Sequence, residues 1–130
     1  MSMRDYVFDR CEDIHRSGAL VLRLETEDLA GGLVQIEASL AFGRTWDGLL
    51  EVWELLEEVA NGQVHRLQYS YQLMVRDQFF FRYDRDPANH PDMPEHKHLP
   101  PQRRIASGPV TFRDVLEEAY SNLAEIDEQE

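Results

Sequence analysis

The sequence predicts an α+β domain in which an antiparallel meander sheet of about five strands runs from Leu20 to Asp84. Apolar and polar residues alternate in the segments 33–42 and 64–75, and a period of two is typical of strands with one buried face. Apolar residues recur at helical spacing in the segment 112–123. We therefore expect a C-terminal helix and an N-terminal helix, both packed on one face of the sheet.

The length of 130 residues and the absence of a linker or repeat favour one domain, residues 1–130. Residues 5–17 have loosely helical spacing, and Gly18 could end that helix. Thr111 with Asp114 three residues later resembles a capping box at the start of the C-terminal helix. The last residues are mostly acidic, so the segment 125–130 is expected to be a frayed tail.

The strands follow from alternation and from turn residues between the alternating segments. Residues 19–27 alternate, and Gly31 and Gly32 mark a turn before the segment 33–42. A polar turn after the segment 64–75 leads into "FFFRYD", which predicts a hairpin that ends at Asp84. A short edge strand is expected at 103–107, and an exposed edge would permit a homodimer through sheet extension.

The segment 49–60, "LLEVWELLEEVA", fits two structures. Its apolar spacing slightly favours a helix that Gly62 could end. Asp47 and Gly48, however, form a hairpin turn signal, after which the same residues could continue as a strand. The residues alone leave both alternatives open.

Composition narrows the class of protein. The net charge is −12, from 25 acids against 13 lysines and arginines, which repels nucleic acid at long range. Bases and histidines nevertheless gather in the segment 76–104, so one locally basic surface is expected on an acidic body.

A single cysteine excludes an intrachain disulfide scaffold. No apolar run is long enough for a membrane span and no signal peptide is visible, so we expect a cytoplasmic protein.

Three of the five histidines fall in the segment 85–101, a proline-rich loop after the predicted hairpin. One hypothesis is metal-independent cleavage of RNA, because imidazole can act as acid or base near neutral pH. A cation is also needed to stabilise the charge of the transition state. The candidate residues for catalysis are His90, His96, His98, Lys97 and Asp84, with Arg82 and Arg85 as substrate contacts.

The prolines that flank "EHKHL" predict its geometry. Pro94 and Pro100 favour extended chain for the residues before them. In an extended chain His96 and His98 project to one side and Lys97 to the other. This arrangement suits two imidazoles that act together, and it suits Lys97 less well as their direct partner.

A second hypothesis is a metal site formed by His90, His96 and His98, with Asp84 or Asp86 as a further ligand. Such a donor set could hold zinc, nickel or manganese. A third interpretation is structural, because histidines in loops often only form hydrogen bonds that fix the loop. The tyrosines and phenylalanines of the hairpin are expected in the core, while Trp46 and Trp53 either pack or mark a partner surface.

The motifs "YSYQL", "FRYD", "PEHKHL" and "SGPVTFRDVLEE" together resemble the TumE-like family of bacterial toxin–antitoxin proteins. The family pattern has strands on both sides of the Asp-Gly turn, which implies a strand for the segment 49–60. Family members typically carry histidine doublets, whereas this chain has "NH" at residues 89–90 and "EH" at residues 95–96. If both doublets were needed for chemistry, this copy would be weakened.

The resemblance implies a toxin that is inhibited by a partner antitoxin, and the hypothesis from the histidine cluster adds action on RNA. In that interpretation Asp84 orients a histidine, and Lys97 and Arg82 contact phosphate. The alternative is a non-enzymatic interaction protein, in which the loop is a scaffold and the acidic surface binds a basic partner. The net charge favours this alternative.

Overall fold

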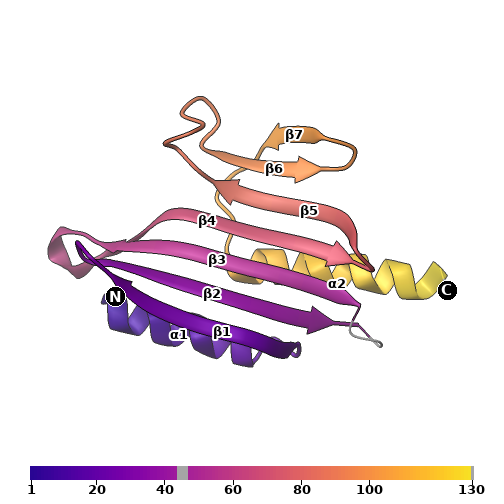
Figure 1. Ribbon diagram of the computed structural model, residues 1–130, viewed down its shortest axis with the longest axis horizontal. Helices are drawn as coiled ribbons and strands as arrows, with labels where there is room; N and C mark the ends of the chain where they lie inside the picture. Colours follow the sequence, from indigo (N-terminus) through magenta and orange to yellow (C-terminus); the bar gives the residue numbers. More distant parts are fainter. Residues whose placement is uncertain (44–46, 130) are drawn as a thin grey trace.

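A seven-stranded antiparallel sheet and two helices form the structure, a computed structural model that describes residues 1–43 and 47–129. The strands follow one another in chain order across the sheet (Figure 1). The elements are α1 (Met3–His15), β1 (Leu20–Leu29), β2 (Leu33–Phe42), β3 (Gly48–Glu58), a 3₁₀ turn (Ala60–Gly62), β4 (Val64–Val75), β5 (Gln78–Arg85), β6 (Glu95–Leu99), β7 (Arg103–Ala106) and α2 (Phe112–Gln129). Trp46 and Glu130 lie outside the described residues.

The prediction of about five strands was too low, and the two further strands lie after Asp84. The strand β7 is the expected edge strand, but β6 forms inside the segment 85–101 that was predicted to be a loop. Only residues 86–94 connect β5 and β6. The prolines favour extended chain there, and the free edge of β5 offers backbone groups that need hydrogen-bond partners. The backbone therefore completes its hydrogen bonds by adding a strand.

Residues 49–58 of the ambiguous segment 49–60 belong to the strand β3, so the helical alternative is wrong. Antiparallel partners pair along its length on both sides, β2 on one and β4 on the other. Its inward positions Leu50, Val52, Glu54 and Leu56 are buried. Pairing in the fold overrides the weak helical period of the isolated segment.

The helix α2 remains helical to Gln129, through most of the segment expected to be a frayed tail.

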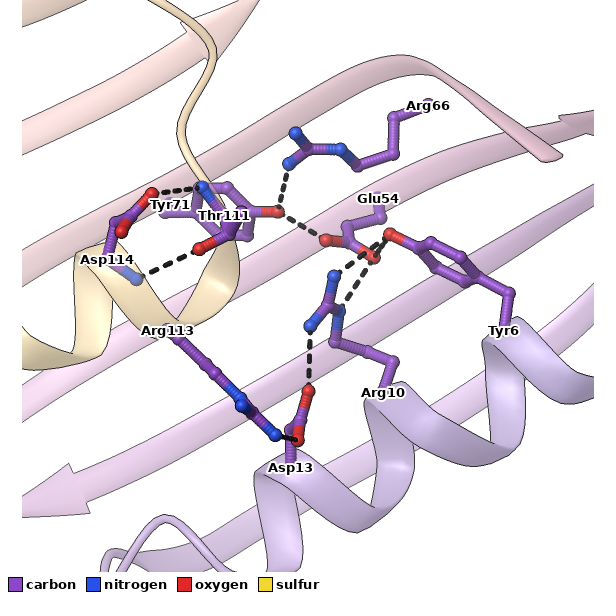
Figure 2. A network of polar contacts seen from close by, with 9 residues as sticks. All are labelled: Tyr6, Arg10, Asp13, Glu54, Arg66, Tyr71, Thr111, Arg113 and Asp114. Carbon is purple, nitrogen blue, oxygen red and sulfur yellow. Dashed lines mark hydrogen bonds and ion pairs between the residues drawn. The ribbon is translucent and has the colours of Figure 1, made fainter. Parts of the chain in front are cut away.

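Both predicted helices pack on one face of the sheet, as expected (Figure 1). Their apolar residues, such as Ile14 on α1 and Phe112 on α2, join the inward side chains of β2 to β5 in one core. Thr111 and Asp114 exchange the two hydrogen bonds of the predicted capping box at 3.1 and 2.9 Å (Figure 2). We call the other face of the sheet, opposite both helices, the open face.

A buried polar network fixes α1 to the sheet (Figure 2). Glu54 of β3 is fully buried and accepts hydrogen bonds from Tyr6 at 3.0 Å and Arg10 at 3.1 Å. Its second oxygen accepts from Tyr71, whose hydroxyl also accepts from Arg66 at 3.0 Å. Burial, and after it the charge of Glu54, raises the pKa of Tyr6 to about 12, so this hydroxyl stays a donor. The network satisfies a carboxylate at a core position.

The substitution Glu54→Gln is expected to lower the free energy of unfolding by about 3 kcal/mol, because it removes the buried charge that stabilises the partly buried Arg10 and Arg66. Urea denaturation followed by circular dichroism measures this change. Glu58→Gln, at an exposed position of the same strand, is the matched control and should change stability by less than about 0.5 kcal/mol. Equal urea midpoints for the two variants would contradict a stabilising role of the network.

Candidate metal centre on the open face

The pairing of β5 with β6 creates the candidate site. Asp84 lies opposite His96, and Arg82 lies opposite His98 in the antiparallel register. Residues two apart on a strand point to the same face, so all four side chains lie on the open face. The predicted divergence of Lys97 from the two histidines is confirmed, because Lys97 contacts α2 on the other face.

Two imidazoles converge on one carboxylate oxygen. The Nε2 atoms of His96 and His98 lie 3.5 and 3.1 Å from Oδ2 of Asp84. The potential ligand atoms of these three residues all lie within 4.8 Å of one another. The ring centroids of His96 and His98 are 4.7 Å apart, and that of His90 is 5.0 Å from His96. The three histidines of the cluster therefore gather in one place, as the sequence led us to expect.

The loop 86–94 fixes the orientation of His96. The side chain is 1% exposed, and its Nδ1 lies 3.1 Å from the carbonyl oxygen of Met93. A carbonyl only accepts, so Nδ1 carries a proton and donates. In the neutral ring Nε2 then presents a lone pair towards the negative oxygen of Asp84. That contact is unfavourable unless a cation, either a proton or a metal ion, lies between them.

Arg82 supplies a cation at the edge of this group. Its Nε donates to Oδ2 of Asp84 at 2.9 Å, and its Nη2 lies 3.1 Å from Nε2 of His98. A guanidinium has no acceptor, so Nε2 of His98 accepts in this contact. Burial, followed by the positive charge of Arg82, lowers the pKa of His98 below its ordinary value. The neutral imidazole that results is the form that binds metals.

Two of the three distances between ligand atoms fit a tetrahedral metal site, and the third, between His96 and His98, is at most 4.8 Å. With metal–ligand bonds of about 2.0–2.1 Å, two ligand atoms of a tetrahedron lie about 3.3 Å apart. The two measured contacts to Asp84, 3.1 and 3.5 Å, lie on either side of that value. The hydrogen bond from His96 to a backbone carbonyl is also the outer contact that metal-binding histidines commonly make. Asp84, His96 and His98 could therefore hold a divalent cation with little movement.

The remaining predicted residues lie elsewhere. His90 is beside the group, but its Nδ1 accepts from Arg104 at 3.1 Å, and it does not belong to the set of converging ligand atoms. Lys97 bonds Glu118 of α2 at 2.8 Å and lies over the ring of Tyr83. Arg85 pairs with Glu95 at 3.2 Å. The structure thus assigns Lys97 to the attachment of α2 and Arg85 to the pairing of β5 with β6.

Sequence reasoning missed two features. Arg104 of β7 lies opposite His98 and next to His90, but its place depends on pairing between strands that the sequence did not predict. The buried Glu54 did leave a signal, because a glutamate at an inward position of an alternating apolar strand requires buried partners. The sequence did not allow this inference, because the inward position of Glu54 follows only if the segment 49–60 is a strand and not a helix.

The fold and the site define an α+β protein with a His₂Asp centre on the uncovered face of an antiparallel sheet. A family model described as toxin TumE matches residues 9–129, and the chain belongs to this family. It is therefore the toxin component of a toxin–antitoxin system, whose partner is an antitoxin. Searches of curated proteins and of solved structures found no significant match. None of the helices in the described residues is long and apolar enough to cross a membrane.

The substitution Arg82→Gln is expected to raise the pKa of His98, because it removes the positive charge that disfavours the imidazolium. His98 should then stay protonated to higher pH, and NMR titration of the imidazole signals measures the shift. Arg16→Gln is the control for net charge, since Arg16 lies exposed on the helix layer. An unchanged or lower pKa of His98 in the Arg82 variant would contradict the assigned contact.

Proposed function

We propose that this toxin acts on RNA at the open face, through a divalent cation held by Asp84, His96 and His98. The observation that carries the proposal is the convergence of two Nε2 atoms on one oxygen of Asp84. Imidazole with carboxylate is a donor set for zinc, nickel and manganese. A bound cation would supply Lewis-acid stabilisation of charge on a phosphoryl group.

The geometry favours this proposal over acid–base catalysis by two free imidazoles. In phosphoryl transfer the attacking and leaving oxygens are roughly in line on opposite sides of phosphorus. An acid and a base that serve them must lie apart, whereas a ring nitrogen of His96 lies within 4.8 Å of one of His98, and both rings face the same carboxylate. His96 is also 1% exposed and is buried behind the loop. A role as ligand needs no direct contact of His96 with substrate.

Arg82 has a second role in the proposal, as the phosphate contact predicted from the sequence. Its guanidinium now bridges Asp84 and His98, where it provides the positive charge that the carboxylate needs. The side chain is 39% exposed and can swing outward. A metal ion would take over both partners, and the released guanidinium could then bind a phosphate oxygen. Arg104, exposed on the neighbouring strand, is a second cation near the site.

Isothermal titration with Zn²⁺, Ni²⁺ or Mn²⁺ tests the ligands. Asp84→Asn and His98→Gln should each weaken binding at least about tenfold, while His65→Gln, at an exposed position of β4, should leave it within twofold. Arg82→Gln should instead strengthen binding about fivefold, because it removes a competing cation next to the carboxylate. Unchanged affinity in Asp84→Asn, or absence of binding by the wild type, would contradict a metal centre.

Induced expression in a bacterial host tests the activity. Wild-type protein should arrest growth and cleave labelled RNA in vitro, and Asp84→Asn and His98→Gln should lose both effects. Lys97→Gln should keep them, because Lys97 lies on the helix face and glutamine can still donate to Glu118. His65→Gln is again the control. Equal toxicity of Asp84→Asn and wild type would instead favour the non-enzymatic interaction protein.

A further inference from the structure

Two cross-strand rows of side chains on the open face change in charge from one edge of the sheet to the other. The strand registers align the first row from Glu25 and Glu37, across Trp53 and Ser70, to Asp84 and His96. They align the second row from Arg23, across Ser39, Glu51 and Gln72, to Arg82, His98 and Arg104. In these rows β1 to β3 carry three glutamates against one arginine, which we call the acidic half, β4 is neutral, and β5 to β7 are rich in cations and histidines, which we call the basic half.

The acidic half keeps an excess of negative charge. Glu25 and Glu37 lie directly opposite each other and share Arg23, at 3.7 and 3.0 Å. Glu51 accepts a hydrogen bond from the neutral Ser39 at 2.6 Å, and within residues 1–43 and 47–129 it forms no ion pair. Like charges opposite each other in a sheet are unfavourable. This part of the open face therefore repels phosphate.

The basic half is narrow. Neighbouring strands lie about 4.8 Å apart, so β5 to β7 span about 10 Å, and Glu51 lies about 10 Å from Arg82 across two strands. That distance is close to the screening length at physiological salt, so the repulsion still acts on a phosphate near the site. A polynucleotide can therefore lay one backbone along the strands, where it crosses the row formed by Arg82, His98 and Arg104, with little room beside it.

We infer that the substrate is single-stranded RNA whose backbone lies along β5 to β7, and that the acidic half of the open face excludes duplex. This inference rests on the proposed function of the same site. A duplex is stiff and carries about twice the charge per unit length of a single strand. When one of its backbones lies over β5 to β7, the other is directed over Glu51 and Glu37 or away from the sheet. A single strand avoids this repulsion.

A pair of RNAs tests the inference: one 12-nucleotide single strand, and the same strand annealed to its complement. Fluorescence anisotropy measures binding and a labelled 5′ end measures cleavage. Wild-type protein should bind and cleave the single strand at least about tenfold better at 50 mM salt. The double variant Glu37→Gln/Glu51→Gln should bind the duplex about fivefold more tightly and change single-strand binding less than twofold. Glutamine keeps the acceptor oxygens for Ser39 and Gln35.

The matched control is Glu117→Gln/Glu125→Gln, which changes net charge equally at exposed positions of α2. Duplex binding of this control should match the wild type. Equal binding of both RNAs by the wild type, or equal gains from the two double variants, would overturn the inference and leave the proposed function intact. Failure to bind or cleave either RNA would overturn both. A single-strand preference that falls about fivefold only in Glu37→Gln/Glu51→Gln would support the inference.

Discussion

The antiparallel register between β5 and β6 is the constraint on which the candidate site depends. A slip of one residue would turn Asp84 away from His96 and would move Lys97 to the open face. Contacts on both faces fix the register. On the helix face Glu118 accepts from Tyr83 at 2.6 Å and from Lys97 at 2.8 Å, which ties neighbouring strands to α2. On the open face Arg82 and Asp84 contact His98, so both sides of the pair stabilise the same alignment.

The sequence predicted the layers of the fold well because its strongest patterns belong to long elements. The alternation of β2 and β4 and the apolar stripe of α2 each persist over many residues, and the capping box at Thr111 is a local motif. Short strands were harder to predict. The strand β6 has five residues, and its existence depends on the free edge of β5 rather than on its own composition. Arg104 was missed for the same reason, because it lies beside the site only when β7 pairs with β6.

The candidate site was predicted in outline because extended geometry fixes which side chains point together. Proline on both sides of "EHKHL" was enough to place His96 with His98 and to separate Lys97. The sequence did not show that His90 would bond Arg104, or that Arg85 would pair with Glu95. Those partners are set by the path of the loop 86–94 and by tertiary pairing. Residue types thus identified the cluster, but only the fold shows which histidines converge on Asp84 and which one lies beside them.

The carboxylates of Glu54 and Asp84 differ in burial and in the partners around them. Glu54 is enclosed, and each of its oxygens accepts hydrogen bonds from groups that remain donors, with two arginines to balance its charge. Such a network is complete and needs no further ligand. At Asp84 the oxygen that Arg82 contacts also faces the Nε2 atoms of His96 and His98, and His98 is 26% exposed. Ring nitrogens that converge on one accessible carboxylate oxygen favour a cation there, so we propose the metal site at Asp84 and assign a structural role to Glu54.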